Sequence, residues 1–312
     1  MIKSALFVLL QVFCLTASFG QNPPWKANGA AISVRPDLDV QWLSTNAFPR
    51  EVWFYEIQPN AFSSDIISNV IEECSFTEKD KIKDDASGTT FRNAEGSRTL
   101  SISFSSGEIN YETPRTHYGP TNLAIDVPQT NQLPALATNL LQKLHIRSSD
   151  ISTYAGQSSI RYLEPALTMF YAGDNTITNI PYRSIYFRRF VDGMPIIGRS
   201  SVIDVGEHGK VEKIAITWPV LKRIKPWATV TQSDLVNYLR KGDAIRGPVP
   251  SDVGDIDWPS IKRLTIKMAI PSYQSDGKHL FPFLRLDAIV DTGSGSVPVG
   301  MDCPIIDEAS TK

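Results

Sequence analysis

Short runs of alternating apolar and polar residues, separated by tight turns, constrain the fold of this chain more than any other feature. The clearest example is RSIYFRRFVDGMPIIGRSSVIDVGEHGKVEKIAITWP, residues 183–219. The dipeptide Asp192-Gly193 and the GEHG stretch at 206–209 fall between its apolar runs. Turn residues between alternating runs are strong hairpin signals. The stretch therefore predicts a three-stranded antiparallel meander.

Three segments with helical spacing of apolar residues each precede strand-like runs. SSDIISNVIEEC at 63–74 has Ser63 in position to cap a helix, and QLPALATNLLQKLHI follows the same spacing. In the third segment, Thr231 and Asp234 form a capping-box pattern and Gly242 is placed to end the helix. The predicted fold class is α+β, with tandem helix-plus-antiparallel-meander units at 45–118, 119–222 and 226–307.

The N-terminus has the pattern of a secretory signal peptide. Lys3 precedes a short apolar run, and small residues stand at Ser18 and Gly20. We expect a signal peptide at 1–20, a flexible arm at 21–44, and a secreted or periplasmic protein with no membrane span in its mature part. The alternative is an uncleaved anchor, although the apolar run is well below the ~20 residues that a span prefers.

Charge and cysteine content exclude several classes of function. The net charge of −2 gives no basic face of the kind that nucleic acid requires, so no nucleic-acid partner is expected. Beyond the signal peptide, Cys74 and Cys303 could form a disulfide or remain free and buried; both alternatives stay open. The histidines are scattered, so we expect neither a metal site nor another cofactor.

The stretch AIVDTGSGSVPVG at 288–300 resembles the active-site loop of a pepsin-type aspartic protease. Such an enzyme needs two neighbouring carboxylates that share a proton, and Asp-Thr-Gly occurs only once here. Aspartate and glycine are also ordinary turn residues. We therefore predict a hairpin turn, with Asp291 exposed and Ile289 directed inward on the preceding strand.

No catalytic residue is predicted. The sequence has no Gly-x-Ser-x-Gly elbow, so we expect the protein not to be an enzyme. Three tryptophans lie beside prolines or in predicted loops and are candidates for an exposed binding surface: Trp25, Trp227 and Trp258. These rings support an alternative reading in which the protein binds or acts on an envelope carbohydrate.

The central segment resembles the PepSY modules and the related fungalysin/thermolysin propeptide (FTP) modules, with the best match at 133–218. Their pattern of a strand, a Gly-[Ile/Met]-Pro hairpin, a second strand and a Gly-Lys turn is carried by Phe187, Asp192, Gly193, Met194, Pro195, Ile196, Gly198, Gly209, Lys210 and Val211. The resemblance implies a cystatin-like shape, in which one helix packs on an antiparallel sheet.

The resemblance also implies a function. Such modules occur as propeptides that assist and inhibit metalloproteases, and in secreted regulators of the YycH/YycI type. This sequence contains no HExxH motif, so any inhibition would act in trans on a separate peptidase. The expected function is that of a secreted, non-enzymatic binding or regulatory protein with a protein partner. The alternatives are the carbohydrate-binding protein and a purely structural component of the cell envelope.

Overall fold

The computed structural model describes residues 30–45, 48–60, 62–114, 122–151, 160–162, 168–172, 175–198, 201–246, 256–292 and 295–306. It divides into two compact units. Unit 1 comprises Met1–Phe54, Lys225–Asp276 and Leu280–Lys312; unit 2 comprises Tyr55–Ile224 and Gly277–His279. The chain passes from one unit to the other inside the strands β3 (Glu51–Gln58) and β16 (Val220–Ala228). The predicted signal peptide at 1–20 lies outside the described residues.

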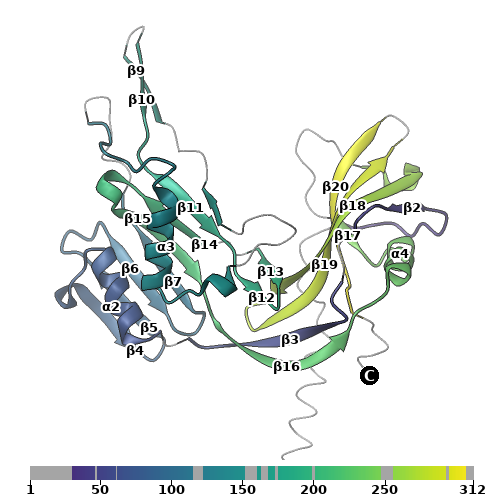
Figure 1. Cartoon of the computed structure of the whole chain (residues 1–312), viewed down its shortest axis with the longest axis horizontal. Coiled ribbons are helices and arrows are strands. Elements are labelled where there is room, and N and C mark those ends of the chain that lie inside the picture. Colours follow the sequence, from purple (N-terminus) through teal and green to yellow (C-terminus); the bar gives the residue numbers. More distant parts are fainter. Residues whose placement is uncertain are drawn as a thin grey trace, which may run out of the picture. The chain divides into compact units, whose positions relative to one another are not determined.

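An eight-stranded sheet is the main element of unit 2 (Figure 1). Its order is β4 (Lys81–Asp85), β5 (Gly88–Arg92), β6 (Thr99–Ser103), β7 (Glu108–Glu112), β15 (Val211–Thr217), β14 (Ser201–Val205), β11 (Arg183–Phe187) and β8 (Ile160–Tyr162). All its pairs are antiparallel. The predicted central meander is confirmed in part. The strands β11, β14 and β15 are neighbours in this order, but the Asp192-Gly193 turn does not join β11 to β14, because it closes a separate hairpin between them.

The pair β7–β15 joins strands that are about a hundred positions apart in the sequence. Ile109 lies opposite Ile216, and Tyr111 lies opposite Ile214. All four side chains are buried and belong to one apolar core. The sheet thus has two halves, one formed by β4–β7 and the other by β8, β11, β14 and β15. Without the β7–β15 pair, each half would have an exposed apolar edge strand open to aggregation.

Two helices, α2 (Ser64–Glu73) and α3 (Leu133–Lys143), lie side by side on one face of this sheet (Figure 1). The Ser63 hydroxyl accepts from the Ile66 amide, which confirms the predicted cap. The Asn69 side chain donates to the carbonyl of Lys143 at 2.8 Å and so links the helices. Each helix leads into a 3₁₀ turn, η2 (Glu78–Asp80) or η3 (Ser148–Asp150).

The predicted fold class is wrong. Strand is the predominant secondary structure of the described chain, at 47%, and it is arranged in curled sheets rather than in tandem cystatin-like units. The strands of 45–118 and 119–222 form one sheet because β7 and β15 pair. The strands of 226–307 instead form most of the sheet in unit 1. The predicted helices are confirmed, whereas the predicted grouping of the strands is wrong.

Two hairpins complete the described part of unit 2. The short strands β12 (Phe190–Val191) and β13 (Met194–Ile197) flank the Asp192-Gly193 turn, where both residues have positive φ. This confirms the predicted turn. Among the described strands, β9 (Thr168–Ala172) and β10 (Asn175–Asn179) form a two-stranded sheet of their own.

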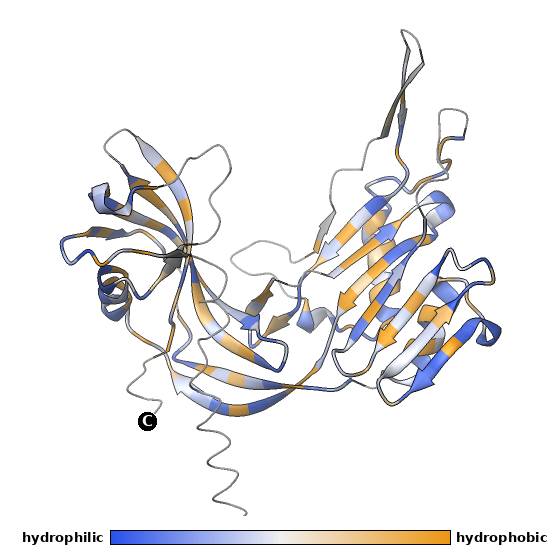
Figure 2. Cartoon of the chain, turned by 180° about the vertical axis from the view of Figure 1, so that it is seen from behind, coloured by the Kyte–Doolittle hydropathy of each residue, from blue (hydrophilic) through white to orange (hydrophobic). Residues whose placement is uncertain are grey.

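Unit 1 is built on a curled antiparallel sheet. Its order is β1 (Ala30–Ala31), β17 (Ile245–Arg246), β20 (Ser296–Cys303), β19 (His279–Asp291) and β18 (Arg263–Ser275), with β2 (Asp39–Trp42) parallel to β18. Polar and apolar residues alternate along these strands (Figure 2). The buried rows therefore share one face of the sheet.

The helix α4 (Gln232–Lys241) packs against this sheet through Leu235 and Leu239. The predicted capping box is confirmed, since the Thr231 hydroxyl accepts from the Asp234 amide and the Asp234 carboxylate accepts from the Thr231 amide. Gly242 ends the helix in the left-handed conformation, as predicted. A final 3₁₀ turn, η5, spans Trp258–Ser260.

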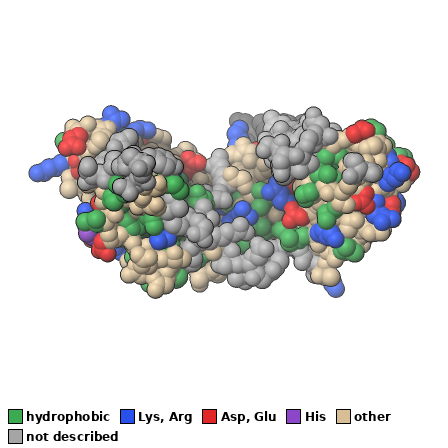
Figure 3. Space-filling view, turned by 90° about the horizontal axis from the view of Figure 1, so that it is seen from above, with side chains coloured by type: hydrophobic (Ala, Val, Ile, Leu, Met, Phe, Trp, Pro, Cys, Tyr) green, Lys and Arg blue, Asp and Glu red, His purple; other side chains and the backbone are tan. Residues whose placement is uncertain are grey.

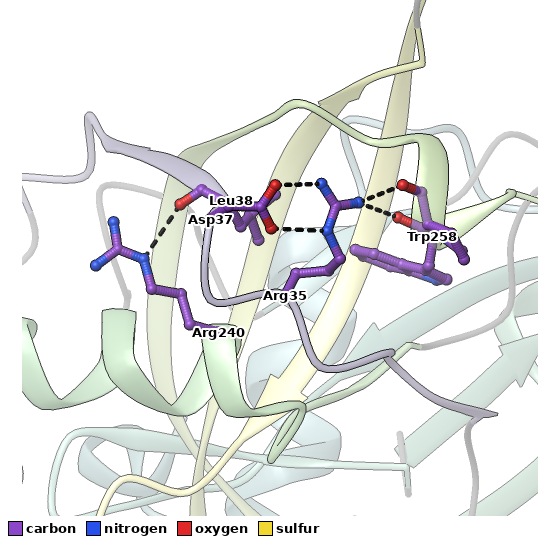
Figure 4. Close-up of polar contacts among 6 residues, drawn as sticks. Arg35, Asp37, Leu38, Arg240 and Trp258 are labelled. Atoms are coloured by element: carbon purple, nitrogen blue, oxygen red, sulfur yellow. Dashed lines mark hydrogen bonds and ion pairs between the residues drawn. The ribbon is translucent and has the colours of Figure 1, made fainter.

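Arg35 anchors the described part of the N-terminal segment within unit 1 (Figure 4). Its guanidinium pairs with Asp37 and donates to the carbonyls of Trp258 and Pro259 at 2.8 and 2.6 Å. Arg240 of α4 donates to the Leu38 carbonyl, and Leu38 itself is buried. The segment around Arg35 is thus held by specific contacts rather than left as a loose arm.

Candidate functional site

The tryptophans proposed as a binding surface are not exposed. Trp227 is 5% exposed and packs on the ring of Phe54, and Trp258 is 7% exposed. The prediction that these two rings are available to a ligand is therefore wrong. Neighbouring prolines indicate irregular backbone, but they carry no information about what covers the side chain. Trp25 lies outside the described residues.

Asp291 is the last residue of β19 and is half-buried, so the prediction that it is exposed in the turn itself is wrong. Its partners in the sheet are Arg263 and Ser296, and the Ser296 hydroxyl donates to its carboxylate at 2.7 Å. These neighbours fit a strand end leading into a turn. The prediction that Ile289 points inward is wrong, because Ala288 and Val290 are the buried residues and Ile289 lies on the opposite face.

Cys74 and Cys303 are both buried and free in this structure, so the alternative of a disulfide between them is not realised. Cys74 ends α2 in unit 2, and Cys303 ends β20 in unit 1. Burial raises the pKa of each thiol well above its usual range, because the thiolate would lose its hydration.

A thiol probe should therefore react with this protein only after unfolding. With native protein at pH 8, we expect no rapid modification by Ellman's reagent, since both thiols stay protonated and covered. In guanidinium chloride both should react. Fast labelling of the native protein, or no labelling after unfolding without reductant, would contradict the assignment of two free buried thiols.

Tyr55, Asp192 and Arg223 form a polar cluster within unit 2. Tyr55 donates to the Asp192 carboxylate, and Arg223 contacts both, at 3.2 Å to the Tyr55 hydroxyl and 2.6 Å to Asp192. Burial and the bond to Asp192 raise the pKa of Tyr55 to about 12. Each charge in the cluster has an opposite partner, so the cluster serves to hold the tip of the β12–β13 hairpin.

An open cleft in unit 2 is the best candidate for a functional site. It has a volume of about 620 Å³. The connection between β5 and β6 forms one wall, and the end of β7 together with β15 forms the other. The lining residues are Asn93, Ala94, Glu95, Ser97, Arg98, Thr113, Pro114 and Glu212. We call this site the Glu212 cleft. The wall at 93–98 is rigid because the Asn93 side chain bonds to both the Arg98 amide and the Ser97 hydroxyl.

Glu212 owes its position to a β-bulge. Asp204 of β14 pairs with Lys213, whereas Val205 pairs with Val211, so Glu212 is an extra residue of β15. Bulges re-aim side chains and are frequent next to functional sites. Here the bulge brings Glu212 beside Thr113, whose amide donates to the Glu212 carbonyl at 2.9 Å and whose hydroxyl donates to the Glu212 carboxylate.

Gly206 provides the space that the Glu212 side chain occupies. A Cβ atom at position 206 would lie 2.6 Å from both Cγ and Oε1 of Glu212. That is shorter than a van der Waals contact, so any side chain at this position would displace the carboxylate. The bulge, the Thr113 hydroxyl and the absence of a side chain at Gly206 therefore fix Glu212 in the wall of the cleft.

Arg98 lines the same cleft, but its guanidinium is engaged in the core. It donates to the Cys74 carbonyl at 3.3 Å and lies over the Phe76 ring at 5.3 Å. Burial raises the pKa of Tyr111, and a hydrogen bond with Arg98 opposes part of that rise. Arg98 thus supports the end of α2 and the cleft floor, and it forms no ion pair with Glu212.

None of the residues predicted from the sequence lies in this cleft. The local signal was weak: NAEGSR at 93–98 resembles any polar connection between strands. Glu212 looks like a solvent-facing residue of an alternating strand, because the bulge that re-aims it depends on pairing with β14. Only the assembled sheet brings 93–98, 113 and 212 together.

Basic and acidic side chains are interspersed over the face seen in Figure 3. Within the described ranges, no three His, Cys, Asp or Glu side chains gather in a way that could hold a metal ion. No helix in the same ranges is long and apolar enough to cross a membrane.

No known protein family matches this chain, and no curated protein is significantly similar to it. The resemblance to PepSY and FTP modules therefore stays a prediction.

Proposed function

We propose that this chain is a secreted, non-enzymatic protein that binds a protein partner through the Glu212 cleft. The observation that carries the proposal is the carboxylate of Glu212, which is fixed in an open cleft and has no basic partner among the described residues. Polar groups that are held rigidly in a concavity and can still accept further hydrogen bonds are the usual anchors of recognition. Secretion rests on the sequence pattern at 1–20.

The partner class follows from the sequence resemblance: a peptidase that the chain inhibits in trans, or a regulator of the cell envelope. Inhibitory binding often uses a preformed surface, and it needs no catalytic group. The carbohydrate alternative has less support, since Trp227 and Trp258 are buried and cannot stack on sugar rings.

A photoreactive amino acid placed at the rim of the cleft tests this proposal. It should be introduced at Glu95, which is exposed, and in a control protein at Ile82, which is 57% exposed on β4. Irradiation in the presence of cells that secrete the chain should link one defined protein to position 95 and not to position 82.

The purified chain should then alter the activity of the linked protein in a reconstituted assay, as inhibition if that protein is a peptidase. Equal labelling from both positions, or a linked protein whose activity the chain does not change, would refute the proposed role.

A further inference from the structure

We infer that the Glu212 cleft receives a basic side chain, a lysine ammonium or an arginine guanidinium, from the partner polypeptide. This inference rests on the proposed function and names the chemistry that the cleft selects. Its basis is the electrostatic state of Glu212 compared with the other carboxylates of unit 2.

Two other carboxylates of unit 2 show what an ion-paired group looks like. Glu112 lies 3.4 Å from the Lys213 ammonium, and Asp192 lies 2.6 Å from the Arg223 guanidinium. In the described part of the chain, Glu212 has no lysine or arginine partner. Its carboxylate accepts a hydrogen bond there only from the Thr113 hydroxyl. Lys213, its neighbour in sequence, is already paired with Glu112.

An unpaired carboxylate in a partly buried wall has lost some of its hydration without gaining a counter-charge. A cation that enters the cleft supplies that charge and can form a charge-assisted hydrogen bond. Such a bond is roughly twice as strong as one between neutral groups. The vacant carboxylate oxygen therefore favours a cationic group over a neutral or anionic one.

The other charges of the cleft strengthen this preference. Glu95 stands exposed on the rim and adds a second negative charge. The one cation of the lining, Arg98, is directed at the Cys74 carbonyl and the Phe76 ring. The part of the cleft that a ligand can reach is thus mainly negative and rich in hydrogen-bond acceptors.

The size of the cleft suits a single long side chain with its flanking backbone. Its volume of about 620 Å³ lies inside the range of about 300–1,000 Å³ that is common for small-ligand clefts. Lysine and arginine carry their charge at the end of an apolar stem. The stem can lie along Pro114 and Ala94 while the charged end reaches Glu212.

Titration of the isotope-labelled full chain with three blocked tripeptides tests the inference by NMR. The probes are Ac-Gly-Arg-Gly-NH₂, Ac-Gly-Gln-Gly-NH₂ and Ac-Gly-Glu-Gly-NH₂. The arginine peptide should shift the amide signals of 93–98, Thr113 and Glu212, with weak binding in about the millimolar range. The glutamine and glutamate peptides should produce no shifts there.

Two variants separate the charge of Glu212 from its position. Glu212→Gln keeps the size and the bond to Thr113 and should weaken binding of the arginine peptide on the order of tenfold. Gly206→Ala keeps the charge but displaces the side chain, and should weaken binding similarly while leaving the melting temperature nearly unchanged. Glu112→Gln, which alters a carboxylate paired outside the cleft, is the matched control and should bind like the parent.

Shifts of the cleft signals by the glutamine peptide as large as those by the arginine peptide would overturn the inference. So would shifts produced by the N-acetylglucosamine trimer instead, which would favour a carbohydrate ligand. The photo-crosslinking result separates this failure from failure of the proposed function. If the Glu212→Gln protein still captures the same partner, the binding role stands and the basic side chain does not.

Discussion

Replacing Gly107 with alanine is expected to lower the free energy of unfolding of unit 2 by about 3 kcal/mol or more. Gly107 lies in the turn between β6 and β7, with φ +63°. A Cβ atom there would lie 2.6 Å from N and Cα of Pro219 and 2.8 Å from the carbonyl carbon of Trp218. These are backbone atoms and cannot move aside as a side chain can. Urea unfolding followed by circular dichroism measures the loss.

Gly96→Ala is the matched control for this variant. Gly96 has a similar φ of +70°, but its nearest neighbour to a new Cβ would be Cδ of Arg92 at 4.0 Å. Gly96→Ala should therefore be destabilised only by the strain of the left-handed backbone conformation, about 1–2 kcal/mol. Equal losses in the two variants would mean that the close approach of Gly107 to Pro219 does not exist.

Phe91→Ala should destabilise unit 2 by about 3–5 kcal/mol and loosen both halves of its sheet. Phe91 is fully buried on β5, in the core that also holds residues of β11, β14 and β15. Because β7 and β15 join the halves, the loss of packing on β5 should spread across the pairing. Hydrogen exchange should therefore become faster in β14 (Ser201–Val205) as well as in β5 and β6.

Thr90→Ala is the matched control for Phe91→Ala, because Thr90 is the preceding residue and lies on the opposite face of β5. It should change the free energy of unfolding by no more than about 0.5 kcal/mol. Faster exchange confined to β4–β7 in the Phe91→Ala protein would show that the halves unfold independently. Two separate helix-plus-meander units would then describe the chain better than one continuous sheet.

Local features of the fold were readable from the sequence because they depend on neighbouring residues alone. The Ser63 cap, the Thr231–Asp234 capping box and the Asp192-Gly193 turn are each decided within a few positions. Their residue types favour one backbone conformation whatever surrounds them.

The pairing of β7 with β15 had no such signal. Ile109 and Ile216 alternate correctly on their own strands, but alternation does not say which strand lies beside which. The same limit hid the cleft, since the bulge at Glu212 exists only when β15 is aligned with β14. The error at Trp227 and Trp258 is related, because the burial of a side chain on β16 or in η5 depends on packing between distant segments.

Reversing the charge at position 212 tests the central claim most directly. The affinities of the arginine and glutamate tripeptides should be measured for the parent and for Glu212→Lys, with the melting temperature confirming that both are folded. The parent should prefer the arginine peptide, and Glu212→Lys should prefer the glutamate peptide. An unchanged preference for arginine in the folded Glu212→Lys protein would contradict the claim that this carboxylate selects the ligand.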